Sequence, residues 1–421
     1  MMLFLRSQFH LFFVGMLLIG FHLSAASTVT VGVDHLFKTQ TQLLKGKCIG
    51  LITNHTAINA DHLTSVQLFK ANQAKVGYKL KALFAPEHGL TGIAHAAELV
   101  ADDLDEGGIP IYSLHGTSRR PAPHMLKGID LLVYDIQDIG SRSYTYISTL
   151  FYVMEAASAQ KIPVMVLDRP NPINGLTVDG PMLEEGFRSF VGYINVPYCH
   201  GLTVGELAQL FNQEYKIGCQ LKVVPMQGWK RTMTFKETGL PWVPLSPHVP
   251  EPDTPLYYPT TGLLGELKMV NMGVGYTLPF KVIGAPWLDA DLLATKLNEQ
   301  GYPGVYFMPF HYKPFFGHFK QEVCHGVLIQ VTDPQTFLPV TTQYLLMGML
   351  KTLYSEEFLK ALTLEKKEED FFNKVCGTGE VLKVIRQEKY ISWKLRDLHR
   401  KEREEFIAKR QKYWNPVYAV E

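Results

Sequence analysis

Residues 80–92 read LKALFAPEHGLTG, and this stretch joins a strand pattern to reactive side chains. From Leu80 to Ala85 the run is almost continuously apolar, which is typical of a parallel β-strand covered on both faces. A proline ends the run, and Glu87 and His88 follow at once. The stretch therefore predicts a buried strand whose carboxyl end carries an acid and an imidazole.

The same strand pattern recurs along the first half of the chain. Short apolar runs alternate with amphipathic stretches of helical length, and this alternation predicts an α/β fold with a doubly wound, mostly parallel sheet. No GxGxxG motif follows the first run, so nicotinamide-dinucleotide chemistry is not indicated. The predicted strands are residues 47–53, 80–86, 109–114, 129–136 and 162–168.

A proline-rich segment, residues 239–259, separates this region from a second unit. Its prolines predict an ordered, extended connection. The charged stretch 393–414 is expected to form one solvated amphipathic helix. Because the chain has 421 residues, and one hydrophobic core rarely serves more than about 250–300, two domains are expected. We predict a first domain over 28–240 and a smaller α+β domain over 241–421.

Residues 1–26 have the pattern of a secretory signal peptide. Arg6 precedes an apolar run, and the small residues 24–26 offer a cleavage site. The apolar run is too short for a comfortable membrane span. We therefore expect cleavage after Ala26, no stable membrane insertion afterwards, and an exported protein that is periplasmic or secreted.

The charge balance of the chain argues against a polyanionic partner. Forty-one Lys and Arg residues face 40 Asp and Glu residues, which leaves a formal net charge of +1. Such a chain has no global field to draw it to nucleic acid, and no nucleic-acid partner is expected.

Polar or ionisable side chains follow the predicted strands. In open α/β sheets, ligands bind outside the carboxyl ends of the strands, where neighbouring loops meet. We therefore expect these side chains to share one rim of the sheet and to form a site. They are Asn54, His55, Glu87, His88, Asp138, Arg142, Tyr144, Asp168, Arg169 and Asn171.

The residue types at this rim favour hydrolysis of a polar substrate, a sugar above all. No GxSxG, HExxH or P-loop motif is present. Glycoside hydrolysis needs two carboxyl groups, and the apolar strand before Glu87 would desolvate it and raise its pKa toward that of a general acid. Asp138 and Asp168 are candidates for the second carboxylate.

A metal-dependent hydrolase is the alternative from the residues alone. A divalent cation could be ligated by His55, His88, Asp135 and Asp138. Their spacing matches no known metal-binding loop, so neither a metal nor another cofactor is expected.

Several long segments resemble signature segments of the NamZ family of exo-β-N-acetylmuramidases. They include GLITNHTAIN (50–59), LFAPEHGLTG (83–92) and VLDRPNPING (166–175), and the likeness runs from about residue 30 to the C-terminus. The resemblance implies a Rossmann-like domain, a smaller C-terminal domain and an active site in the cleft between them. It also implies release of N-acetylmuramic acid from the non-reducing ends of peptidoglycan-derived muropeptides or disaccharides.

The resemblance assigns roles to particular residues. It makes Glu87 the natural catalytic acid, and it adds His200 and Glu206 from the segment HGLTVGE (200–206). Glu206 is either a second carboxylate or a first-turn residue that favours the helix dipole. The lactyl carboxylate of the sugar suits an arginine fork. The arginines in strand-end loops are Arg119, Arg120, Arg142 and Arg169, and Arg142 is the choice, with Tyr144 beside it.

One segment departs from the family pattern. In GLLGELKMVNMGVGYTLPF (262–280), Val274 stands where the family has an arginine, and Glu266 is displaced by one position from the usual acid. This departure supports a second hypothesis, a non-catalytic muropeptide-binding protein, whereas the intact PEHG segment supports an active enzyme.

Overall fold

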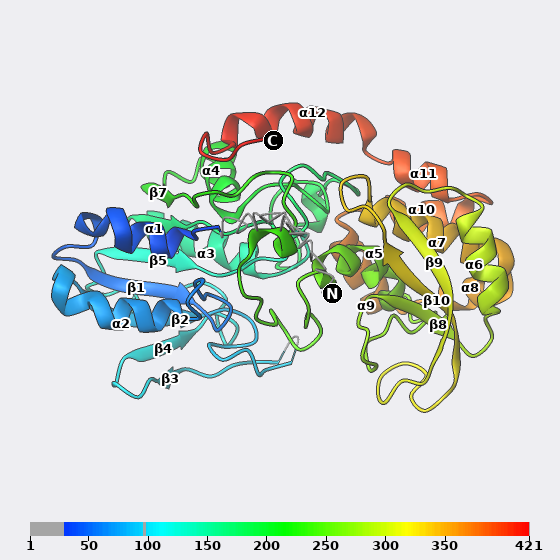
Figure 1. Ribbon diagram of the computed structural model, residues 1–421, viewed down its shortest axis with the longest axis horizontal. Helices are drawn as coiled ribbons and strands as arrows, with labels where there is room; N and C mark the ends of the chain where they lie inside the picture. Colours follow the sequence, from blue (N-terminus) through cyan, green and yellow to red (C-terminus); the bar gives the residue numbers. More distant parts are fainter. Residues whose placement is uncertain (1–28, 96–97, 421) are drawn as a thin grey trace, which may run out of the picture.

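The computed structural model describes residues 29–95 and 98–420 (Figure 1). The predicted signal peptide and its cleavage site lie outside the described residues. Within them, no helix combines the length and the apolarity that crossing a membrane requires.

The first unit is built on a seven-stranded sheet with the order β3-β4-β2-β1-β5-β6-β7. Every neighbouring pair is parallel except β3 with β4. The predicted mostly parallel sheet is thus confirmed, and its chain order reverses between β1 and β5. The strands are β1 (Cys48–Thr53), β2 (Lys79–Ala85), β3 (Asp103–Leu104), β4 (Pro110–Ser113), β5 (Leu131–Asp135), β6 (Val164–Leu167) and β7 (Leu221–Val224).

Helices cover both faces of this sheet, which confirms the doubly wound architecture. Along β5, Leu131 and Val133 join the core on one face, and Leu132 and Tyr134 join the core on the other. This alternation explains why the strand is apolar throughout, because every side chain of a doubly covered strand is buried. The helices are α1 (Gly32–Thr39) and α2 (Ser65–Val76) on the first face, and α3 (Tyr146–Ala159) and α4 (Val204–Glu214) on the second.

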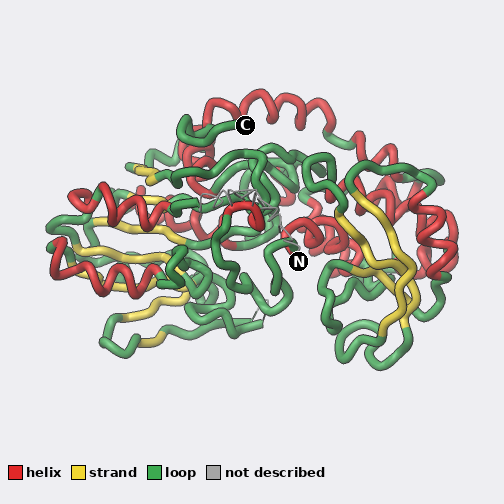
Figure 2. Tube along the Cα trace, viewed as in Figure 1, coloured by secondary structure: helices red, strands yellow, loops and turns green. Residues whose placement is uncertain are grey.

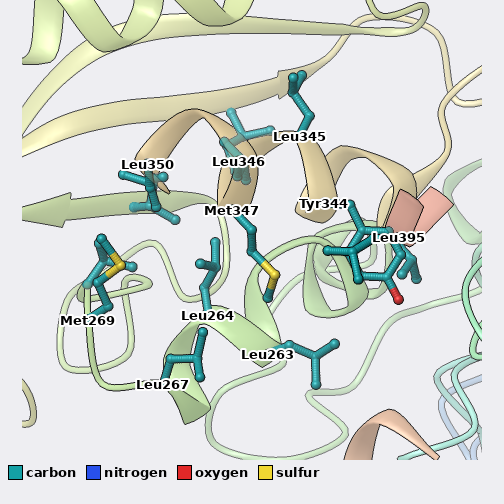
Figure 3. Packing of buried hydrophobic residues seen from close by; sticks show 14 of the residues in the cluster. Leu263, Leu264, Leu267, Met269, Tyr344, Leu345, Leu346, Met347, Leu350 and Leu395 are labelled. Atoms are coloured by element: carbon teal, nitrogen blue, oxygen red, sulfur yellow. The ribbon is translucent and has the colours of Figure 1, made fainter. Parts of the chain in front are cut away.

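The second unit combines a three-stranded antiparallel sheet, ordered β8-β10-β9, with a group of helices. Its core forms where α5 packs on α7, and Figure 3 shows leucine side chains of both helices around Met347. The elements are α5 (Thr254–Glu266), β8 (Val282–Ala285), α6 (Ala290–Asn298), β9 (Val305–Tyr312), β10 (Cys324–Val331), α7 (Pro339–Leu353), α8 (Ser355–Ala361), α9 (Lys366–Cys376), α10 (Glu380–Gln387) and α11 (Ser392–Asp397).

The expectation of an extended connection over 239–259 is wrong for its last part. Helix α5 begins at Thr254, inside the proline-rich segment. Pro255 occupies the first turn, where a missing backbone N–H costs nothing, and Pro259 is accepted inside the helix. Proline content alone therefore does not reveal that a buried helix begins in this segment.

The expected single helix over 393–414 is also wrong. It is two helices, α11 and α12 (Arg400–Arg410), separated by His399 in a left-handed conformation with φ 54°. After this break the chain leaves the second unit and crosses back to the first (Figure 1). There Ala419 pairs with Lys230, and the Tyr418 hydroxyl donates to Asp168 at 2.6 Å.

Candidate active site

A cavity of about 470 Å³ opens between the two units. Loops gather in this region, between the carboxyl ends of the large sheet and helix α5 (Figure 2). The residues that the site argument uses come from the loops after β2, β4, β5 and β6, from α5 and from α9. They are Glu87, His88, His115, Arg119, Tyr144, Thr145, Phe190, Tyr258, Glu266 and Lys374.

Glu87 is the best-positioned acid in this cavity. It stands just after β2, and the left-handed backbone of His88 (φ 71°) turns the chain away behind it. Its side chain is buried, and the Thr145 hydroxyl donates to Oε2 at 2.5 Å. Thr145 is the residue before α3, so the two chain segments meet at the rim predicted from the strand ends.

His115, which follows β4, flanks Glu87 on the other side. Its Nε2 lies 3.6 Å from Glu87 Oε1, which is too long for a hydrogen bond but close enough for an electrostatic interaction. Burial lowers the pKa of His115, and the Glu87 carboxylate opposes this effect. His115 was not among the residues predicted from the sequence, because its strand was predicted without a polar residue assigned to its end.

Glu266 is the second carboxylate on the cavity wall, at the last position of α5. Tyr258, Gly262 and Glu266 are spaced by four residues and so share one helix face, which lines the cavity. Burial raises the pKa of the half-buried Glu266. Burial also raises the pKa of Tyr258 to about 12, and the charges of Glu266 and Glu87 add to this effect. Tyr258 therefore lies within the electrostatic reach of both carboxylates.

Glu266 is not among the site residues predicted from the sequence, where it only departs by one position from the family pattern. The four-residue spacing from Tyr258 is the signal that could have found it. Four-residue spacing is informative only in a segment known to be helical, and the prolines of this segment favoured an extended conformation instead.

Of the predicted site residues, Glu87, His88 and Tyr144 line the cavity. His88 Nδ1 lies 2.7 Å from the Ala94 carbonyl oxygen, so the ring is oriented by its own loop. The other predicted residues lie outside the lining. They are Asn54, His55, Asp138, Arg142, Asp168, Arg169, Asn171, His200 and Glu206.

Asp168 and Glu206 hold the start of α4 and the returning C-terminus. Asp168 accepts hydrogen bonds from the Thr203 hydroxyl at 2.7 Å and from the Gly205 backbone at 2.8 Å. Glu206 closes the capping box with Thr203 and forms a fully buried ion pair with Arg231. These contacts give both carboxylates a structural role, and a part in the chemistry stays a prediction for each.

Asp138 and Asn54 lie near the point between β1 and β5 where the strand order reverses. The Gly140 backbone donates to Asp138 Oδ2 at 2.7 Å, and burial raises the pKa of Asp138 to about 7. Asn54 Oδ1 accepts from the Thr56 hydroxyl at 2.6 Å and shapes the turn after β1.

The two predicted arginines are buried on protein acceptors. Arg142 donates to the carbonyl oxygens of Pro181 and Val196, both at 2.7 Å, and of Cys376 at 2.5 Å. Because Cys376 ends α9, this side chain ties the first unit to the second. Arg169 forms a two-point ion pair with Asp135.

Three further predicted residues contact the backbone of neighbouring loops. Asn171 Nδ2 donates to the Leu202 carbonyl at 3.0 Å, and His55 Nε2 lies 2.7 Å from the Pro244 carbonyl oxygen. His200 Nδ1 accepts from the Leu202 backbone N–H at 3.2 Å, and burial lowers the pKa of His200 to about 3. In residues 29–95 and 98–420, no group of three or more His, Cys, Asp or Glu side chains is arranged to hold a metal ion.

Comparison with known proteins matches both units to one family. Residues 49–253 match the family model described as "Exo-beta-N-acetylmuramidase NamZ, N-terminal". Residues 256–415 match the model described as "Exo-beta-N-acetylmuramidase NamZ, C-terminal". The peptidoglycan beta-N-acetylmuramidase NamZ of Bacillus subtilis is 44% identical over 352 residues, which are 83% of each chain.

Two crystal structures of DUF1343 family proteins from Bacteroides fragilis share the fold. One is 40% identical with a TM-score of 0.86, and the match covers 92% of this chain and 98% of that one. The other is 27% identical with a TM-score of 0.72, and the match covers 94% of this chain and all of that one.

Proposed function

Because the chain belongs to the exo-β-N-acetylmuramidase NamZ family, we propose that it hydrolyses the terminal β-linked N-acetylmuramic acid at the non-reducing ends of peptidoglycan fragments. It is a glycoside hydrolase, and its substrates are muropeptides or disaccharides derived from peptidoglycan. The observation that carries the proposal is Glu87, a buried carboxyl group held by a hydroxyl donor at the wall of a cavity large enough for a sugar.

Glu87 protonates the glycosidic oxygen as the bond from that oxygen to the anomeric carbon breaks. Water adds to the anomeric carbon, and its proton passes to a second base, so that one water is consumed for each bond cleaved. Glu266, on the face of α5 that lines the cavity, is the carboxylate that suits this second role. The acetamido oxygen of the substrate is the other candidate for the displacement.

Replacement of Glu87 by Gln tests the proposal. We expect the variant to lose activity on a chromogenic N-acetylmuramic acid β-glycoside by at least about 10²-fold, because Gln cannot supply the proton. Glu106→Gln, at an exposed turn between β3 and β4, is the matched control and should retain full turnover. Steady-state kinetics with and without EDTA complete the design.

The other outcomes separate the rival functions. Loss of turnover in EDTA would favour the metal-dependent hydrolase. A well-folded wild type that binds the sugar without turnover would favour the muropeptide-binding protein.

We also propose that the enzyme is exported, as a periplasmic or secreted protein. The signal-peptide pattern of residues 1–26 supports this location, and a cell-wall substrate is consistent with it. Mass spectrometry of the protein purified from an exporting host should find a mature chain that begins at Ser27. An intact N-terminus on a membrane-bound protein would contradict export with cleavage.

A further inference from the structure

We propose that Arg119 binds the lactyl carboxylate of N-acetylmuramic acid and so selects this sugar over N-acetylglucosamine. The inference rests on the proposed function and assigns a specificity residue to the same cavity. It replaces the expectation from the sequence that Arg142 has this task, because Arg142 is fully buried on carbonyl oxygens outside the lining.

Arg119 is an anion-binding fork that forms no side-chain hydrogen bond or ion pair with the residues that the structure describes. It lines the cavity, and its guanidinium carbon lies 4.2 Å from the centre of the Phe190 ring. Stacking on an aromatic face orients the planar group and leaves its N–H edge free to donate. The side chain of Arg119 is exposed. No carboxylate of the described residues lies within 4 Å of its guanidinium group.

Arg119 also stands at a suitable place relative to the catalytic acid. The His115 ring contacts the Phe190 ring at 5.7 Å between centroids and reaches Glu87 Oε1 at 3.6 Å. A series of contacts through these two rings therefore connects Glu87 to Arg119 in the cavity lining. In N-acetylmuramic acid the lactyl ether is on C3 and the scissile oxygen on C1, so the acid and the carboxylate binder must reach one sugar ring at two positions separated by C2.

The other cations near the cavity are less suited to this task. Lys374 lines the cavity, but its Nζ is paired with Asp370 at 2.6 Å. Arg120, the neighbour of Arg119, stacks on Tyr152 in a similar way, yet it is paired with Glu155 at 2.6 Å and lies outside the lining. Arg120 is therefore a matched control for Arg119.

The test measures sugar binding by calorimetry in the Glu87→Gln background, where turnover cannot interfere. Arg119→Ala should weaken the binding of N-acetylmuramic acid by about 10- to 100-fold, the range for losing hydrogen bonds between charged groups. Binding of N-acetylglucosamine should stay within about twofold. Arg120→Ala should leave both affinities unchanged, and Arg119→Lys should restore part of the loss, because the charge returns without the fork.

A modified ligand makes the test independent of any change in the fold. N-acetylmuramic acid with a lactyl carboxamide should bind the Arg119 protein more weakly than the parent sugar does. It should lose nothing further in Arg119→Ala. Two results would overturn the assignment of Arg119 but leave the proposed function standing. One is equal binding of the parent sugar and the carboxamide by the Arg119 protein, and the other is an equal loss of affinity for N-acetylmuramic acid and N-acetylglucosamine in Arg119→Ala. Failure of the Glu87→Gln protein to bind either sugar would overturn the proposed function as well.

Discussion

At the scale of single residues, the function depends on which carboxyl groups face the cavity. Strand-end position brought Glu87, His88 and Tyr144 to the lining, but Asp138 and Asp168 sit at similar strand ends without facing it. The carboxyl edge of a parallel sheet both binds ligands and anchors the following loops. Residue type and strand position cannot separate these two tasks, since both use carboxylates, amides and arginines.

Glu266 gives a prediction at this scale. We expect Glu266→Gln to lower kcat by about 10²- to 10⁴-fold if its carboxylate accepts the proton of the attacking water. The affinity for N-acetylmuramic acid should change far less, since the substituted side chain has nearly the same size. Glu356→Gln, at an exposed position of α8, is the control, and stopped-time assays on the chromogenic substrate provide the measurement. A kcat within a factor of three of the wild type would assign the displacement to the acetamido oxygen instead.

At the scale of elements, the apolar runs located the strands of the large sheet well. The run 47–53 became β1 (Cys48–Thr53), and the run 129–136 became β5 (Leu131–Asp135). A strand buried on both faces has a strong signal, because few other structures need an unbroken apolar run of that length. Helix α5 was missed in part, because proline is accepted in the first turn of a helix as readily as in an extended segment.

Helix α4 provides the prediction for an element. Glu206→Gln leaves Arg231 buried without its ion-pair partner, and we expect the stability of the first unit to fall by roughly 3–5 kcal/mol. Urea denaturation followed by circular dichroism measures this loss. The exposed pair of Arg400 and Glu404 supplies the comparison, because Glu404→Gln should cost less than about 1 kcal/mol.

Activity separates the structural role of Glu206 from a catalytic one. At a temperature where Glu206→Gln is folded, we expect kcat within about threefold of the wild type. A loss of turnover as large as that of Glu87→Gln, in a protein that remains folded, would return Glu206 to the catalytic machinery.

At the scale of the whole molecule, the cavity depends on how the two units are joined. Arg142 connects them through its bond to the carbonyl of Cys376, beside the α9 residues Lys374 and Val375 that line the cavity. The last residues of the chain add a second connection where Tyr418 reaches Asp168. Few local sequence signals report such contacts, because the partners are separated by 234 and 250 residues.

The Arg142 connection leads to a further prediction. Arg142→Met removes three hydrogen bonds to buried carbonyl oxygens, so we expect stability to fall by about 3 kcal/mol or more and KM to rise as the α9 wall shifts. The preference for N-acetylmuramic acid over N-acetylglucosamine should persist in the folded variant. A selective loss of that preference, measured as the ratio of the two binding constants, would show that Arg142 holds the lactyl carboxylate after all.

The sequence by itself determined the doubly wound sheet, the family and the acid at the end of β2. These follow from local patterns, namely unbroken apolar runs and a short motif whose residues are neighbours in the chain. Only the tertiary structure decided which strand-end groups face the cavity, that α5 brings Tyr258 and Glu266 to it, and that Arg119 lines the cavity whereas Arg142 is buried on carbonyl oxygens. The physical reason is that a side chain's task depends on which acceptors and charges surround it, and packing between distant segments sets those surroundings.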